Sequence, residues 1–268
     1  MARDDVVPKE TPAKVNTLLR RHQEMDPHDG GFHYRSVIGK LNYLEKSTRP
    51  DIAYAVHQCA RFAADPKRPH VDAVRWIGRY LVGTRDKGLI FKPNEESFRC
   101  YVDADFVGAW DREGDPQSDP DTARSRSGYV ATLAGCPLFW ASKLQSVIAL
   151  SSSESNFVAL STALREIIPI MNILREMESL GIPVPGSKPT IACRVFEDNS
   201  GALEMAVNEK FRPRTKHINA KFHHFRTYVD KGHIIVRPIK SEEQPADYLT
   251  KPVANELHKR HRRTIQGW

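Results

Sequence analysis

The sequence has few cysteines, no long apolar run and only a modest excess of one charge sign. Its 268 residues include four cysteines, which lie far apart and form no CxxC pair, so neither a disulfide framework nor a cysteine zinc site is expected. No run of about 18 apolar residues is present, and Met1–Asp5 lacks the apolar stretch of a signal peptide. These absences argue against a membrane-spanning or secreted protein and favour a reducing intracellular compartment, with length for one large or two modest domains.

The positive charge is concentrated in one stretch. The chain carries 40 Lys and Arg against 33 Asp and Glu, a formal net charge of +7, and the segment from Glu209 to Lys240 holds nine basic and two acidic residues. Interleaved aromatic residues make this pattern typical of a surface that contacts nucleic-acid phosphates. A solvated helix face with buried phenylalanines has the same composition. The candidate nucleic-acid-binding residues are Arg212, Arg214, Lys216, His217, Lys221 and Arg226.

Histidines in this stretch have other interpretations as well. His217 is placed either to contact phosphate or to make a structural hydrogen bond where a helix begins. The adjacent pair His223 and His224 does not share a helix face, so it is not expected to bind a metal.

The first third of the chain predicts a short lead-in and a small helical unit. Residues 1–30 contain prolines and glycines with little apolar periodicity and are expected to be flexible. Apolar residues then recur at three- and four-residue intervals over 34–44, 51–62 and 70–81, which predicts three helices in a unit covering residues 31–95. This unit has no cluster of carboxylates.

Residues 96–253 predict an α/β domain with a mixed sheet, because short β-branched and aromatic runs alternate with helical patterns. Two of the strands are expected to form a hairpin through Ala134 and Gly135, and Pro169 should kink the long helix, which has Ser152 or Ser153 as its N-cap. Residues 254–268 are expected to form a basic C-terminal tail. The expected strands cover 98–106, 127–133, 137–142, 190–196 and 232–238, and the expected helices cover 153–180, 199–207, 215–231 and 245–250.

Three aspartates lie where these predicted elements begin or end. Asp103 lies within the first strand, Asp198 follows the fourth, and Asp247 lies near the start of the last helix. An aspartate inside a strand is unfavourable unless its charge is used. Three carboxylates at one sheet edge would suit Mg²⁺, which prefers oxygen ligands and supports phosphodiester hydrolysis in two-metal sites. Asp105 and Glu197 are competing neighbours, and any single aspartate has the simpler interpretation of a helix cap or a solvent-exposed residue.

Ordered motifs give a more specific indication. The first two motifs resemble the end of the reverse transcriptase region of Ty1/copia-type retrotransposon polyproteins, and the later ones are similar, in order, to the ribonuclease H domain that follows it. The resemblance covers roughly residues 32 to 253. The motifs are Tyr34–Leu44, Thr48–Val56, Tyr101–Asp105, Ser125–Tyr129, Ala149–Glu154, Glu197–Asn199, Arg214–Ile218 and Ala246–Pro252.

The resemblance implies a ribonuclease H fold, with a five-stranded mixed sheet and helices on both faces. It also implies hydrolysis of the RNA strand of an RNA/DNA hybrid at a Mg²⁺ site, with Mn²⁺ as a possible substitute, built from Asp, Glu, Asp and Asp. Asp103, Asp198 and Asp247 match three of these positions. The implied partner is the polymerase portion of the same polyprotein, and the implied location is a cytoplasmic virus-like particle or the nucleus.

The chain departs from the family at the second acid, the Glu. Asn156 stands where the family has its catalytic Glu, so a ligand charge is lost and the side chain is shorter. Glu154 is two positions away, about 200° around a helix, and cannot take over. We therefore expect cleavage to be weakened or lost, with metal binding retained through the three aspartates. The alternative is a catalytically inactive domain that binds nucleic acid or supports a polymerase.

Two further absences narrow the function. The polymerase motif of an aromatic residue followed by x-Asp-Asp does not occur in a strand-turn-strand context, so this chain is not expected to polymerise DNA. The loop 241–244 before Asp247 lacks the His that many cellular ribonucleases H carry there. This second absence is common in the family.

Overall fold

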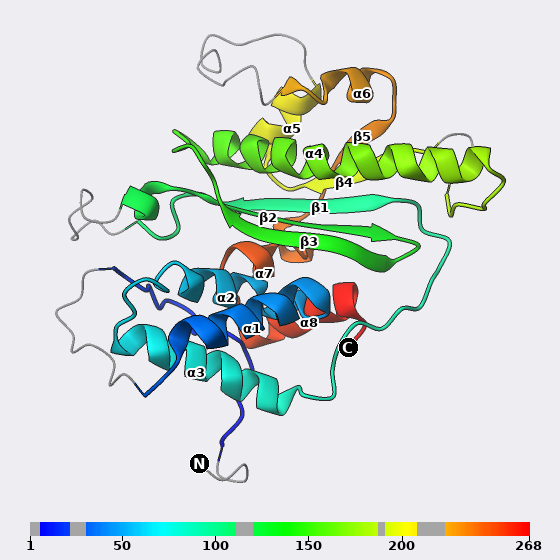
Figure 1. Cartoon of the computed structure of the whole chain (residues 1–268). Coiled ribbons are helices and arrows are strands. Elements are labelled where there is room, and N and C mark those ends of the chain that lie inside the picture. The colour runs from blue at the N-terminus through cyan, green and yellow to red at the C-terminus, as the bar shows by residue number, and fades with distance from the viewer. Residues whose placement is uncertain (1–5, 22–30, 111–119, 187–190, 208–222) are drawn as a thin grey trace.

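The computed structural model describes residues 6–21, 31–110, 120–186, 191–207 and 223–268. Within these residues a mixed sheet lies at the centre, with helices on both of its faces (Figure 1). The predicted fold class is confirmed.

The sheet has five strands in the order β3-β2-β1-β4-β5. β2 pairs antiparallel with β1 and β3, whereas β4 pairs parallel with β1 and β5. The turn between β2 and β3 uses Ala134 at φ 52° and Gly135 at φ 73°; positive φ at both positions suits the twist of a two-residue hairpin. The strands are β1 Arg99–Asp105, β2 Arg126–Leu133, β3 Cys136–Leu144, β4 Cys193–Glu197 and β5 Ile234–Pro238.

One face of the sheet is covered by α4 (Ser152–Ser179), α5 (Ser200–Val207) and α6 (Arg226–Asp230). α4 begins one residue earlier than the sequence predicts, because the side chain of Ser151 accepts the N–H of Glu154 as the N-cap. This helix is long and apolar enough to cross a membrane, but 61% of its most apolar stretch is buried inside the protein. Here it forms the core that packs on β1 and β2.

The opposite face carries α7 (Asp247–Thr250), α8 (Asn255–Gln266) and the predicted helical unit (Figure 1). Ala53, Trp140, Leu249 and Ile265 share one buried cluster, and the Trp140 indole N–H donates to the Glu45 carbonyl at 2.8 Å. The helical unit is therefore packed directly onto the sheet. It consists of α1 Tyr34–Ser47, a 3₁₀ turn at Pro50–Ile52, α2 Ala53–Ala60 and α3 Arg68–Gly83.

Residues 6–21 differ from the flexible lead-in that the sequence predicts. They form an irregular strap along α3, held by hydrogen bonds to the backbone: the Trp76 indole N–H donates to Thr11 O and the Arg79 Nε–H to Val7 O. Leu19 and Ala13 pack against the core of the helical unit. Contacts of this kind do not require apolar residues at regular intervals. The sequence pattern of residues 6–21 therefore indicated only a flexible linker.

The predicted basic tail is also wrong in structure, since residues 255–266 form α8. Its inner face buries His258, His261, Ile265 and Gln266, and the Gln266 amide donates to the Asp51 carboxylate at 3.2 Å. The C-terminal segment is thus part of the folded core and not an appendage.

One predicted helix is only partly within the described residues. Of the expected helix over 215–231, residues 215–222 lie outside them, and the described part contains the short helix α6.

Candidate functional site

Asp103 and Asp247 are brought together where α7 packs on β1. Asp103 lies within β1 and is 4% exposed, and Asp247 is the first residue of α7. The hydroxyl of Thr250 donates to Asp103 Oδ2 at 2.5 Å and to the Asp247 carbonyl at 3.0 Å. Two of the three predicted aspartates therefore share one buried site.

Gly128 makes this close approach possible. It is the residue opposite Asp103 on β2, and a Cβ at this position would lie 2.6 Å from Thr250 Cγ2 and 2.9 Å from Leu249 Cβ. α7 can rest on the strand only because no side chain intervenes. This explains the glycine in the Ser125–Tyr129 motif in terms of packing.

The site is crowded with negative charge and is only partly compensated. Burial, together with the neighbouring Asp103 carboxylate, raises the pKa of Asp247 to about 7. Lys251 opposes this shift, since its ammonium lies 3.0 Å from Asp247 Oδ1. Burial lowers the pKa of Lys251, but Asp103 and Asp247 outweigh that effect and raise it overall.

Asn156 lies beside the same site, but its side chain is engaged elsewhere. Its Oδ1 accepts the backbone N–H of Ala104 at 2.8 Å, and its Nδ2 donates to the Ser152 carbonyl at 3.1 Å. The amide therefore ties the first turn of α4 to β1. Glu154 does not substitute for it, since its carboxylate accepts the N–H of Leu150 at 2.8 Å, in the loop before the helix.

Asp198, the third predicted aspartate, follows β4 and is half-buried, and its Oδ2 accepts the hydroxyl of Ser241 at 2.6 Å. Its neighbour Glu197 is the more buried of the two, with 0% exposure. Burial and the charges of Asp103 and Asp198 raise the pKa of Glu197 well above its ordinary value, although the Asn199 N–H opposes the shift. The sequence analysis gave Glu197 only as an alternative to Asp198. In the structure Glu197 is the buried acid at the end of β4, and the charge of Asp103 contributes to its raised pKa.

Gln244 is a positioning residue that the sequence did not single out. It is fully buried, and its Nε2 donates to the Val102 carbonyl at 2.9 Å and to the Phe196 carbonyl at 3.3 Å. These carbonyls lie on β1 and β4, one residue before Asp103 and one before Glu197. Gln244 therefore fixes the start of α7 against both strands that carry acids.

The described residues do not form a ready-made metal centre. No group of three or more His, Cys, Asp or Glu side chains within them is arranged to hold an ion. The carboxylates of Asp103 and Asp247 have the chemistry that a hard cation prefers, but the Asn156 oxygen is committed to Ala104 and Asp198 to Ser241. As they stand, the residues do not supply the ligand set of a two-metal site.

Most of the predicted nucleic-acid-binding residues lie outside the described residues: Arg212, Arg214, Lys216, His217 and Lys221. Arg226 is described, and its guanidinium donates to the Met205 carbonyl at 3.1 Å and to His223 Nδ1 at 2.9 Å. This residue packs α6 against the end of α5. The preceding aromatic, Phe225, is fully buried, in accord with the core interpretation of that ring.

The mixed five-stranded sheet with helices on both faces is a ribonuclease H-like fold. No family model matches the chain. Among solved structures, LC11-RNase H1, isolated from compost, is 17% identical and is matched over 61% of this chain and 96% of that one, with a TM-score of 0.38.

The curated relatives identify the family. The chain is 36% identical over 220 residues to the retrovirus-related Pol polyprotein from transposon TNT 1-94 of Nicotiana tabacum, covering 82% of this chain and 15% of the relative. It is 34% identical over 251 residues to the Pol polyprotein from transposon RE2 of Arabidopsis thaliana, covering 92% and 16%. The chain belongs to the Ty1/copia-type Pol polyproteins and spans about one sixth of the length of these relatives.

Proposed function

We propose that this chain is the ribonuclease H region of a Ty1/copia-type polyprotein that binds RNA/DNA hybrids but cuts them weakly or not at all. The observation that carries the proposal is the engagement of Asn156 with Ala104 and Ser152. An active site of this type needs a fourth acid beside Asp103, and the residue at that place is neutral and its oxygen is already used. The polymerase portion of the same polyprotein is the proposed partner, in an intracellular setting.

Binding of the hybrid is supported by charge. The excess of nine basic over two acidic residues between Glu209 and Lys240 is suited to backbone phosphates, while the acids gather at Asp103 and Asp247. Bound Mg²⁺ or Mn²⁺ would supply activated water and charge stabilisation in a complete site of this kind. Because the residues present do not complete that site, we assign no step to a metal.

The alternative function is a non-catalytic domain that supports a polymerase. One observation favours this alternative. The helical unit, which resembles the end of a reverse transcriptase region, is packed on the sheet through the hydrogen bond from Trp140 to Glu45. It differs from the preferred proposal in requiring no binding of an RNA/DNA hybrid.

The test compares this chain with Asn156→Glu and Asn156→Gln. Hybrid is bound in Ca²⁺ and the complex is then chased with Mg²⁺. We expect all three proteins to bind and only Asn156→Glu to cut; Asn156→Gln has the length of Glu without its charge, so it separates the two effects. Asp103→Asn combined with Asn156→Glu should abolish the gain.

Equal cutting by this chain and Asn156→Glu would overturn the proposed loss of cleavage. Failure of all three proteins to bind hybrid would leave the supporting domain as the remaining function.

A further inference from the structure

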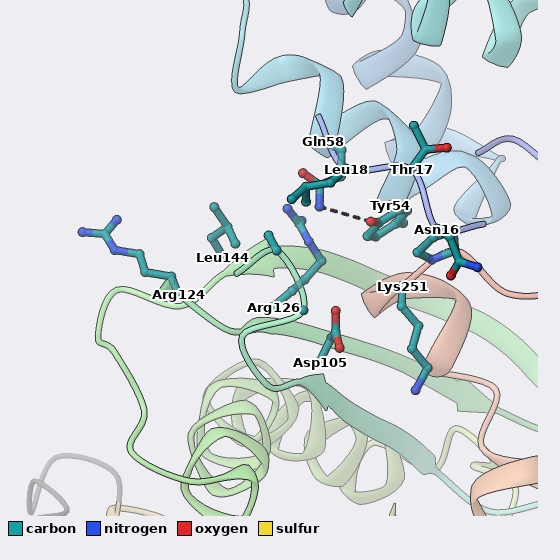
Figure 2. A pocket seen from close by; sticks show the side chains of 13 residues that line it. Asn16, Thr17, Leu18, Tyr54, Gln58, Asp105, Arg124, Arg126, Leu144 and Lys251 are labelled. Atoms are coloured by element: carbon teal, nitrogen blue, oxygen red, sulfur yellow. Dashed lines mark hydrogen bonds between the residues drawn. The ribbon is translucent and has the colours of Figure 1, made fainter. Parts of the chain in front are cut away.

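A cavity of about 400 Å³ opens beside the aspartate site, between the sheet and the helical unit. Its walls come from the strap, from Tyr54 and Gln58 of α2, and from Asp105 and Arg126 at the adjacent ends of β1 and β2 (Figure 2). This volume is within the range of pockets that hold small ligands. Four of the motifs named above contribute to its walls, and they come from both parts of the chain: Tyr54, Asp105, Arg126 and Lys251.

Arg126 is the unusual residue of this cavity. It is 3% exposed, and its side chain extends toward Gln58 and Tyr54 (Figure 2). One guanidinium nitrogen donates to Ser142 Oγ at 3.2 Å, and the group lies 5.4 Å from the centre of the Tyr54 ring. Within the part of the chain that the structure describes, its Nε and Nη2 have no hydrogen-bond partner.

A second buried arginine of the same molecule has hydrogen-bond partners for its guanidinium group. Arg49 is also 3% exposed, but its fork pairs with both oxygens of Asp51 at 2.9 and 2.8 Å and reaches Thr84 as well. Arg126 has no such carboxylate within ion-pair distance among the described residues. A buried cation without an anion is costly, and burial lowers the pKa of Arg126 to about 10.

The other charged residues of the lining are Lys251, Arg124 and Asp105. The charged ends of Lys251 and Arg124 pair with Asp247 at 3.0 Å and with Asp121 at 3.1 Å. Asp105 is the carboxylate in the lining, and it is the residue opposite Arg126 in the pairing of β1 with β2.

We propose that Arg126 binds a phosphate group in this cavity. A guanidinium presents a planar fork that matches two phosphate oxygens, and the orphaned Nε and Nη2 are neighbouring donors of that fork. Asp105 is two residues beyond Asp103 on β1, so a backbone phosphate here would lie along the strand from the aspartate site. Its assignment to a nucleic-acid backbone rests on the proposed function; the binding of phosphate itself does not.

The first experiment measures phosphate binding without any nuclease readout. The melting temperature of the full chain is followed as inorganic phosphate replaces chloride at constant ionic strength, for this chain, Arg126→Met, Arg126→Lys and the remote control Arg75→Met. We expect phosphate to raise Tm in this chain and in the control, and not in Arg126→Met. Without phosphate, Arg126→Met should melt no lower than this chain, because it removes an unpaired buried charge. Arg126→Lys keeps the charge without the fork and should respond weakly.

The second experiment measures the affinity for an RNA/DNA hybrid in Ca²⁺ with the same proteins. A backbone phosphate predicts that Arg126→Met weakens binding about 10-fold or more, with Arg75→Met unchanged. A phosphate response without any change in hybrid affinity would assign the site to a free phosphate or nucleotide. If acetate raises Tm as much as phosphate does, or if neither probe depends on Arg126, the phosphate site is overturned, whatever the outcome for cleavage.

Discussion

The Asn156 side chain accepts a hydrogen bond from the backbone N–H of Ala104, the residue that follows Asp103. This bond joins the first turn of α4 to the strand that carries the first acid. The residue that removes the expected ligand charge therefore has a structural use, because it satisfies a buried donor of β1.

Asn156→Ala should lower the free energy of unfolding by about 1–3 kcal/mol, because it leaves the Ala104 N–H without an acceptor in a buried place. Asn156→Asp keeps the acceptor for the Ala104 N–H, but it replaces the Nδ2 donor to the Ser152 carbonyl with an oxygen and adds repulsion with Asp103, so it should also destabilise the fold, for a different reason. Urea unfolding of the three proteins measures the difference. A loss below about 0.5 kcal/mol for Asn156→Ala would show that the bond contributes little.

Gly128→Ala should displace α7 from β2, because the new Cβ would lie 2.6 Å from Thr250 Cγ2 and 2.9 Å from Leu249 Cβ. Overpacking of this kind typically costs about 1–3 kcal/mol. Gly39→Ala is the matched control, since a Cβ there meets no atom within 4 Å and the position is in helix α1, where Ala is the better residue. Chemical denaturation should show a loss for the first variant and none for the second; equal effects would refute the packing argument.

Asp51 joins three parts of the fold, and its replacement should strongly lower the free energy of unfolding. Its carboxylate accepts from Arg49, from the Tyr80 hydroxyl at 2.5 Å and from Gln266 at 3.2 Å. Asp51→Leu leaves the buried guanidinium of Arg49 unpaired and should cost roughly 3–5 kcal/mol.

The double variant Arg49→Met/Asp51→Leu removes both charges and should recover part of that loss. Unfolding free energies for the single and double variants, compared as a cycle, measure the coupling. Additive losses would mean that the pair is not the source of the effect.

The sequence was sufficient to predict those helices and strands whose apolar residues all point toward one hydrophobic core. β1 to β5, the hairpin at Ala134 and Gly135, and α1 to α3 were predicted within a few residues, because alternation or helical spacing survives in them. α8 was missed because its buried positions include His258, His261 and Gln266, which a hydropathy pattern treats as surface.

The candidate site was predictable only in part. Asp103 and Asp247 could be paired from the motifs, and the neutral residue at 156 could be recognised. The partner of Asn156, the role of Gln244 and the buried state of Glu197 depend on how loops cross the sheet edge, which one sequence does not reveal. The cavity around Arg126 is still further from prediction, since α2 and β2 meet there across more than 60 residues of chain.

The same two histidines of α8 predict how stability depends on pH. Burial lowers the pKa of both His258 and His261 from 6.5 to about 4, so the folded protein holds them neutral while the unfolded chain takes up protons below about 6.5. The contribution of these two histidines to stability should therefore be full above pH 6.5 and be lost as the pH drops toward 4, with a slope of up to about 1.4 kcal/mol per pH unit for each histidine. The raised pKa of Asp247 acts in the opposite direction, so the histidine contribution is read from the difference between this chain and its histidine variants.

Urea unfolding between pH 4 and 7.5 measures this slope, and the controls follow from the packing. His258→Gln and His261→Gln should each flatten the curve in this window, because each removes one buried imidazole. An unchanged slope in both α8 variants would mean that other groups carry the acid sensitivity. Since α8 also donates Gln266 to Asp51, protonation of its histidines should loosen the contact between the C-terminal helix and the helical unit before the sheet itself unfolds, and hydrogen exchange at pH 5 should show faster exchange in α8 than in β1.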